Sequence, residues 1–380
     1  MNTDNLSALA VGIGVVALIT GFGVYFNNPE LNKAASGQQE GFVQATIIEN
    51  GTVTNVQIDK SQFKLAPELT KISGYINTEQ VTLADLRGKV VLVDFWTYSC
   101  INCIRTIPYL NAWHEKYADD GLVIVGVHTP EFEFEKDYNN VKAAVEKFEI
   151  EYPVVQDNDR GTWKAYENRY WPRKYLVDNE GYIRYDHIGE GRYAETEKVI
   201  QSLLSERAAY MGGNVTFDES VSRPENAQSV NFGQIDTPEL YFGYQFARAP
   251  LGNPEGFKPD QVVTYTIPDG VTITPNRIYL DGEWKNNADH MELQSETGRI
   301  VLSYSAKAVN IVAGGTGELH ISEDGSELTN SRGSVVSEDG SVTIDGQKLY
   351  NLAMHDEYGK HQIVIDVSGT GFEIYTFTFG

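Results

Sequence analysis

A chain of 380 residues is too long for one ordinary hydrophobic core, so we expect two domains and additional segments. The formal net charge of −23 argues against a nucleic-acid partner, because a phosphate backbone requires a basic surface. This charge also disfavours binding to anionic lipid and is typical of a protein that stays soluble in a salty or extracellular medium.

The chain begins with an uncharged apolar segment, residues 6–26, that has the length of a membrane-spanning helix. A cleaved signal peptide usually has basic residues before a shorter apolar core, and residues 1–5 contain none. Residues 34–36 (Ala-Ala-Ser) are a weak cleavage site, so a cleaved signal and a buried helix stay open as alternatives. We expect residues 1–27 to form a single-pass anchor in the cytoplasmic membrane, and residues 28–64 to link it to soluble domains outside the cytoplasm.

Residues 65–212 alternate between strand-like and helix-like patterns. Continuous apolar runs are typical of buried parallel strands, and apolar residues three and four positions apart are typical of helices. This alternation predicts an α/β fold in which helices flank a central mixed sheet with an inserted αβ unit. Expected strands are 90–96, 122–127, 152–155 and a hairpin at 174–185, with a small hairpin or edge strand at 76–83; expected helices are 104–117, 141–148 and 196–204.

Residues 213–380 have a different pattern, in which short alternating strands are separated by Gly, Asp and Asn. This spacing predicts a second domain that is an all-β sandwich or jelly roll. Expected strands are 261–267, 277–280, 299–304, 309–312, 341–344, 362–367 and 372–379.

The two cysteines of the chain, Cys100 and Cys103, are separated by two residues and follow the apolar run 90–96. A strand, a short turn and a helix would place Cys100 at a helix N-terminus, where unpaired N–H groups and the helix dipole stabilise a thiolate. Two cysteines on one helical turn can also form a disulfide. We therefore predict a dithiol/disulfide redox pair that needs no other cofactor.

Two structural alternatives exist for the Cys-x-x-Cys pair. Half of a zinc site would need further ligands, but the seven histidines are scattered singly, so no metal is expected. A purely structural disulfide would close a very short loop and would restrict the unfolded chain little.

Two further residues support redox chemistry. Asp94 lies in the apolar run before Cys100, where burial would raise its pKa and let it accept a proton from the second thiol. Pro172 precedes the expected strand at 174–177, and a cis peptide there would bring a backbone turn beside the disulfide. An exposed Asp at a strand end and an ordinary trans Pro are the alternatives.

The run Val93-Asp94-Phe95-Trp96 before Cys-x-x-Cys, together with Pro108 and Pro172, resembles the thioredoxin superfamily. The longer segments DFWTYSCINCIRTIPYL, NAWHEKY, GVHTPEF and NRYWPRKYLVD resemble the soluble part of DipZ-type thiol-disulfide oxidoreductases, which are related to TlpA-like and cytochrome c maturation reductants. The resemblance covers approximately residues 66–380. It implies a thioredoxin-like fold outside the cytoplasmic membrane, followed by a β-sandwich like a carbohydrate-binding module.

The resemblance also implies roles for individual residues. Cys100 is expected to be the nucleophile, Cys103 the resolving cysteine and Pro172 the cis-proline. We expect Trp96 and Trp171 to line a substrate groove.

We therefore predict a membrane-tethered extracytoplasmic thiol-disulfide oxidoreductase that reduces disulfides in exported proteins. DipZ proteins carry a multi-span electron-importing domain, whereas one apolar segment is found here, so we expect a separate membrane donor of the CcdA-like type. The C-terminal domain is expected to contact glycan, the cell wall or the redox partner.

Two other functions stay open. A peroxiredoxin-like thiol peroxidase would have a Thr or Ser three residues before the reactive cysteine, with a Pro directly ahead of it. Thr97 satisfies the first condition, but Trp96 occupies the position of the Pro. A surface glycan-binding or adhesion module with a redox-silent domain is the third function.

Overall fold

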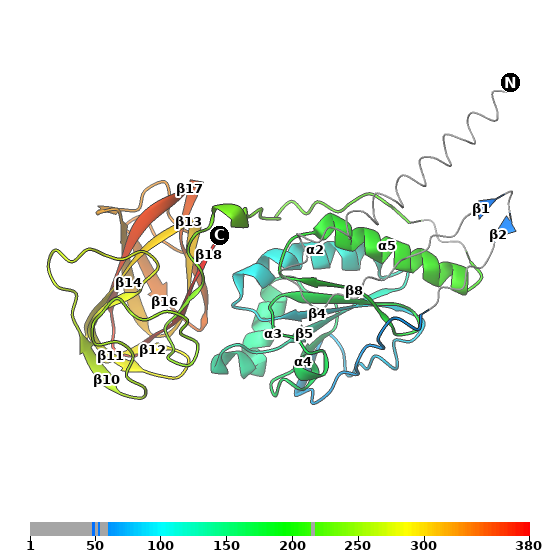
Figure 1. The fold of residues 1–380 in the computed structure, drawn as a ribbon, viewed down its shortest axis with the longest axis horizontal. Helices are drawn as coiled ribbons and strands as arrows, with labels where there is room; N and C mark the ends of the chain where they lie inside the picture. The colour runs from blue at the N-terminus through cyan, green and yellow to red at the C-terminus, as the bar shows by residue number, and fades with distance from the viewer. Residues whose placement is uncertain (1–47, 50–51, 54–59, 214–216) are drawn as a thin grey trace, which may run out of the picture.

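The computed structural model describes residues 48–49, 52–53, 60–213 and 217–380. The predicted anchor, residues 1–27, and most of the predicted linker, residues 28–64, lie outside the described residues. Within the described part, no helix combines the length and the apolar character needed to cross a membrane. The described chain forms an α/β lobe and an all-β lobe, seen side by side in Figure 1. A short antiparallel pair, β1 (Ile48–Glu49) and β2 (Thr52–Val53), precedes them.

The α/β lobe contains a six-stranded mixed sheet in the order β3-β6-β5-β4-β7-β8. Strands β4, β5 and β6 are parallel, and the other pairs are antiparallel. The predicted thioredoxin-like arrangement of a mixed sheet with flanking helices is therefore confirmed. The strands are β3 (Gly74–Ile76), β4 (Val90–Trp96), β5 (Leu122–His128), β6 (Val154–Gln156), β7 (Arg173–Val177) and β8 (Ile183–Ile188); the helices are α2 (Ile101–Tyr117), η2 (Glu133–Lys136), α3 (Tyr138–Lys147), α4 (Gly161–Ala165) and α5 (Tyr193–Tyr210).

The central strand β4 is buried on both faces, because alternate side chains of a strand point in opposite directions. Its residues at positions 90, 92 and 96 pack with α2, α3 and α5, and those at 91, 93 and 95 pack with the α4 side. This double burial explains the continuous apolar run and fixes the end of β4 next to the start of α2.

One expected strand pair is wrong. The edge strand β3 is present, but residues 81–83 do not pair with it. The Glu68 carboxylate accepts hydrogen bonds from the backbone N–H groups of Leu83 (2.7 Å) and Ala84 (3.1 Å), so a side chain replaces a neighbouring strand there. The apolar side chains of Val81 and Leu83 still pack into the core.

The all-β lobe contains one continuous ten-stranded sheet around its own hydrophobic core. The first part of β13 pairs with β11 and its last part pairs with β18, so the strand changes neighbours along its length, as strands do at the corners of folded sheets. The strands are β9 (Leu240–Tyr241), β10 (Val262–Tyr265), β11 (Tyr279–Asn286), β12 (Met291–Leu293), β13 (Thr297–Gly315), β14 (Gly317–Glu323), β15 (Ser326–Glu327), β16 (Ser341–Ile344), β17 (Lys348–Ser368) and β18 (Phe372–Phe379), preceded by the 3-10 helix η3 (Phe232–Gln234).

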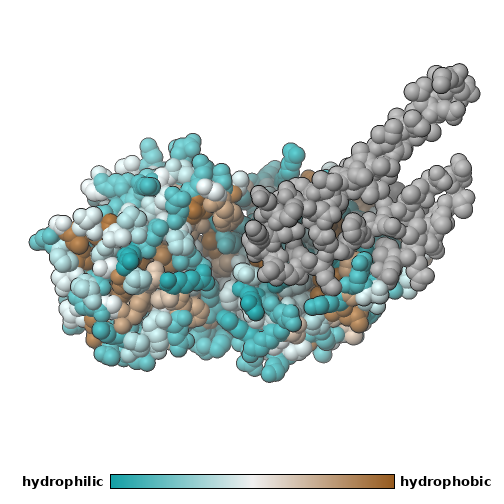
Figure 2. Space-filling model, in the orientation of Figure 1, coloured by the Kyte–Doolittle hydropathy of each residue, from teal (hydrophilic) through white to brown (hydrophobic). Residues whose placement is uncertain are grey.

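The two lobes share an apolar contact. Tyr241, Val312 and Tyr375 of the all-β lobe belong to the hydrophobic cluster that fills one face of the α/β sheet. Figure 2 shows apolar residues, in brown, where the lobes meet. The contact includes Phe132 and Phe134, whose rings lie 5.0 Å and 4.7 Å from the ring of Tyr375. The all-β lobe is therefore packed directly against the segment that follows β5.

Candidate active site

Cys100 and Cys103 lie at the start of α2, directly after the central strand β4. Cys100 is the N-cap residue, and its Sγ accepts a hydrogen bond from the backbone N–H of Cys103 at 3.4 Å. The sulfur therefore lies among the backbone N–H groups that have no partner within the first turn of α2. Cys100 is partly exposed, Cys103 is 1 % exposed, and both are free thiols. Cys100 can therefore meet a substrate, whereas Cys103 can react only with what is bound to Cys100.

The Cys103 thiol is held in its neutral form. Burial raises the pKa of Cys103 well above its ordinary value, and the neighbouring Cys100 and Asp94 raise it further. A thiol attacks a disulfide only as a thiolate. Cys103 therefore needs a proton acceptor before it can act.

Asp94 is suited to this task. The carboxyl group shares the α2-facing side of β4 with Leu92 and Trp96, and the residue is only 2 % exposed. Burial raises the pKa of Asp94 to about 7, and the charge of Lys174 opposes this increase. Among the described residues, Asp94 Oδ1 has no hydrogen-bond partner. The carboxyl group can thus both gain and lose a proton near neutral pH.

Lys174 is a site residue that the sequence analysis missed. It is fully buried and lies opposite Asp94 in the antiparallel register of β4 and β7. Burial lowers the pKa of Lys174, while Asp94, Cys103 and Glu190 raise it. Its Nζ donates to the Gly189 carbonyl at 3.2 Å. The position of Lys174, two residues after Pro172, could have indicated a role in the site. A lysine in a short strand, however, is usually expected to be exposed.

The Trp171–Pro172 peptide is cis, as expected. Pro172 directly precedes Arg173, which pairs with Phe95, so it lies beside the end of β4 from which Cys100 follows. The Pro172 carbonyl accepts a hydrogen bond from Gly189 N (2.8 Å), and the Trp171 indole N–H donates to the Thr129 carbonyl (2.9 Å). Trp171 is partly exposed and packs against the same cluster as Cys100, so it stays a groove candidate.

Trp96 does not line a substrate groove. Its side chain is 2 % exposed and its ring meets the buried ring of His128 edge-on, with the centroids 5.2 Å apart. His128 in turn lies 3.3 Å from Thr97 Oγ1 through its Nε2 atom. Burial lowers the pKa of His128 to about 3, so its ring is neutral and supports the loop before Cys100.

A buried glutamate braces the active-site loop, residues 97–99. Glu135 accepts hydrogen bonds from Ser99 Oγ and from the backbone N–H groups of Glu131 (2.6 Å) and Phe132 (3.0 Å). Burial raises the pKa of Glu135, and these donors oppose the increase. Glu135 was also missed, because it looks like an ordinary surface acid in the segment EFEFEK.

The middle of the Cys-x-x-Cys motif is held by an ion pair. Arg105 contacts both carboxylate oxygens of Glu190, at 2.8 Å and 2.9 Å, and donates to Asn102 Oδ1 at 2.7 Å. Because the adjacent Gly189 contacts Pro172 and Lys174, the 189–190 loop joins the helix, the cis-proline turn and the buried lysine.

The all-β lobe reaches the active-site loop. The Tyr98 hydroxyl donates to the Gln347 carbonyl at 3.4 Å, and the Tyr98 ring meets Phe134 edge-on. Gln347 and Phe134 also line an open groove of about 870 Å³ between the lobes. Most of the other groove residues are polar, among them Asp137, Asn140, Asp260, Asn287, Asp289 and His290.

Comparison with known proteins agrees with this geometry. A family model described as AhpC/TSA family matches residues 63–186, and one described as Thioredoxin like C-terminal domain matches residues 237–380. The chain is 33 % identical over 339 residues to protein DipZ of Mycobacterium tuberculosis, a match that covers 87 % of this chain and 46 % of DipZ. This chain thus spans about half the length of that relative.

Shorter proteins match about a third of this chain. The thiol-disulfide oxidoreductase YkuV of Bacillus subtilis is 34 % identical over 37 % of this chain and 94 % of its own length. The crystal structure of a thiol-disulfide isomerase from Corynebacterium glutamicum is 28 % identical, covering 37 % of this chain and 97 % of that one, with a TM-score of 0.35. The AhpC/TSA match contains Cys100 and Cys103, the YkuV match covers nearly all of that protein, and the chain therefore belongs to the thioredoxin-like thiol-disulfide oxidoreductases of the TlpA and DipZ type.

Proposed function

We propose that this oxidoreductase reduces disulfides in exported proteins from a membrane-anchored position outside the cytoplasm. The observation that carries the proposal is the asymmetry of the site. Cys100 is partly exposed at a helix N-terminus, and Cys103 is buried, protonated and accompanied by the titratable Asp94. In this arrangement Cys100 can attack the disulfide of a substrate, and Cys103 can then release the substrate from Cys100.

The reaction begins when the Cys100 thiolate attacks one sulfur of a substrate disulfide. A mixed disulfide forms, and the second substrate sulfur leaves as a thiolate. Asp94 accepts the Cys103 proton, and the Cys103 thiolate then attacks Cys100 Sγ. The Cys100–Cys103 disulfide forms, the substrate leaves as a dithiol, and two electrons have moved to the substrate.

The cellular setting is part of the proposal. The uncharged segment at residues 6–26 supports a single-pass anchor. Exported proteins as substrates, with cytochrome c maturation as the setting, are proposed from the resemblance of the sequence to DipZ-type oxidoreductases. A CcdA-like membrane protein would restore the dithiol. The polar interdomain groove supports contact of the all-β lobe with the substrate, and glycan binding by this lobe stays a prediction.

The test is reduction of insulin disulfides by the dithiol form of the chain, with the reduction potential measured in parallel. A reductant should have a potential near the roughly −270 mV of thioredoxin, and an oxidant one near the roughly −120 mV of DsbA. Cys100→Ser should abolish insulin reduction. An oxidising potential, unchanged turnover in Cys100→Ser, or peroxide consumption faster than insulin reduction would each contradict the proposal.

A further inference from the structure

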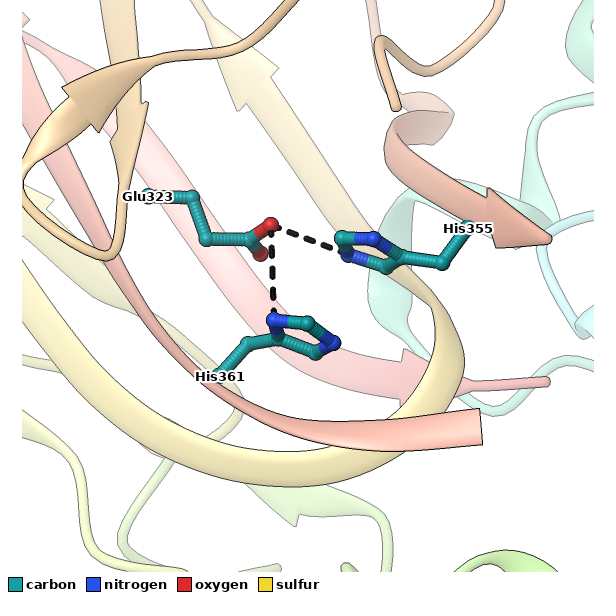
Figure 3. A group of neighbouring side chains, drawn as sticks. All are labelled: Glu323, His355 and His361. Atoms are coloured by element: carbon teal, nitrogen blue, oxygen red, sulfur yellow. Dashed lines mark ion pairs between the residues drawn. The ribbon is translucent and has the colours of Figure 1, made fainter. Parts of the chain in front are cut away.

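Two histidines and a carboxylate converge in the all-β lobe, far along the sequence from the cysteines (Figure 3). Glu323 Oε2 lies 2.9 Å from His355 Nε2 and 3.9 Å from His361 Nδ1. The two imidazole rings are stacked, with centroids 3.9 Å apart and planes 3° apart. The Glu323 side chain is 4 % exposed, while those of His355 and His361 are 14 % and 19 % exposed. The group is therefore preformed and still reachable from solvent.

These residues come from two strands, β14 and β17, and lie beside a bulge in β17. In the β13–β17 ladder, Ala306 pairs with Gly359 and Ala308 with Met354, so residues 355–358 lie opposite Lys307 alone. His355 begins this bulge and His361 follows it. Glu323 ends the neighbouring strand β14. A group bound by all three would join both sides of the bulge to β14.

Surrounding side chains hold the three groups in place. The Tyr304 hydroxyl donates to Glu323 Oε1 at 2.6 Å, which leaves Oε2 facing the histidines. Asp324 Oδ2 lies 2.9 Å from His361 Nδ1, and Asp324 Oδ1 accepts from the backbone of Gln362. Tyr304 is an outer partner of the kind that orients a ligand in metal sites. Asp324 contacts the same nitrogen of His361 that faces Glu323, so it would have to release this nitrogen or join the ligands when an ion binds.

The spacing fits a metal ion. Imidazole nitrogens and carboxylate oxygens bind Zn²⁺ at about 2.0–2.2 Å, which places neighbouring donors of a tetrahedral site roughly 3.3 Å apart. The observed separations of 2.9 Å and 3.9 Å lie on either side of this value, and all three donor atoms lie within 4.8 Å of one another.

Two imidazoles and one carboxylate whose donor atoms lie this close together are a donor set that Zn²⁺ and related ions prefer. We propose that Glu323, His355 and His361 bind a divalent first-row transition metal ion of the Zn²⁺ class, which clamps the β17 bulge to β14 and keeps one coordination position for water.

The experiment must separate this site from the cysteine pair, because a dithiol also binds zinc. We would titrate ZnCl₂ into the full chain carrying Cys100→Ser and Cys103→Ser, and measure the stoichiometry and affinity by calorimetry. One ion per chain is expected, together with an increase in the thermal midpoint. In the same background, His355→Gln, His361→Gln and Glu323→Gln should each weaken binding by at least about tenfold.

His320→Gln is the matched control, since His320 also lies on β14, is exposed and is 3.9 Å from Glu327. It should bind zinc like the parent. Thermal melts in chelator check that each variant is folded, and Glu323→Gln preserves the shape of the side chain if a histidine variant fails to fold. Absent binding in the cysteine-free chain, unchanged affinity in the folded site variants, or an equal loss in His320→Gln would overturn the proposal.

Discussion

Replacing Asp94 by Asn should stabilise the protein at alkaline pH while slowing its chemistry. Burial raises the pKa of Asp94 from its ordinary value of 3.8 to about 7. Between these two values the folded state keeps a proton that the unfolded state has lost, so the free energy of unfolding falls as the pH rises. A shift of about three pKa units corresponds to roughly 4 kcal/mol. The wild type bears this whole penalty above about pH 7 and none below about pH 4.

The variant lacks the titrating group and avoids this penalty. The pKa of about 7 already includes the attraction of Lys174, so we expect Asp94→Asn to be more stable by roughly 4 kcal/mol near pH 8. The difference should shrink towards zero near pH 4. Disulfide reduction should fall by roughly 100-fold near neutral pH, because Cys103 loses its proton acceptor.

Denaturant unfolding at several pH values measures the stability difference, and Asp178→Asn is the control. Burial would raise the pKa of Asp178, but contacts with Lys60 (2.9 Å) and Arg184 (3.0 Å) lower it. Its contribution is present above the ordinary Asp pKa and is lost as the pH falls, so Asp178→Asn should destabilise the protein near neutral pH. The reasoning fails if Asp94→Asn is less stable near pH 8 or if its gain does not change with pH.

Three further substitutions test the surroundings of the site. Lys174→Met removes the charge that opposes the high pKa of Asp94, so the pH profile of insulin reduction should move upward from about 7; an unmoved profile would refute this role. Glu135→Gln weakens the hydrogen bond to Ser99 and should lower the free energy of unfolding by about 1–3 kcal/mol. No measurable loss would show that Glu135 does not stabilise the active-site loop. Phe134→Ala opens the contact between the lobes and should cost about 3–5 kcal/mol in denaturant unfolding; a loss below about 1 kcal/mol would show that this contact is loose.

Local patterns were sufficient for most elements of the α/β lobe. The apolar runs predict β4 and β5 closely, because strands buried on both faces have few polar residues. The helical spacing at 104–117 lies within α2, and the Asp178–Gly181 turn correctly separates β7 from β8. The motif also placed Cys100 at a helix N-terminus, since the strand, turn and helix signals are adjacent in sequence.

Features that depend on contacts between residues far apart in the sequence could not be predicted. Two short expected strands, 299–304 and 309–312, are parts of the single strand β13, because the irregularity near Lys307 is a bulge and not a turn. Lys174 and Glu135 act in the site through partners about 80 and 36 positions away, so no local pattern indicated their burial. The histidines at 355 and 361 are too far apart for a helical pair, and only the bulge brings their rings together.

Trapping of the mixed disulfide tests the central claim most directly. Oxidised insulin would be incubated with the dithiol form of the chain or with its single-cysteine variants, and adducts would be quantified by mass spectrometry under non-reducing conditions. Cys103→Ser should accumulate a covalent adduct through Cys100, because no resolving thiol is left to release the substrate. Cys100→Ser should form none, because Cys103 is buried. An adduct through Cys103 at a comparable rate, or no adduct in Cys103→Ser, would contradict the assignment of Cys100 as nucleophile and Cys103 as resolving cysteine.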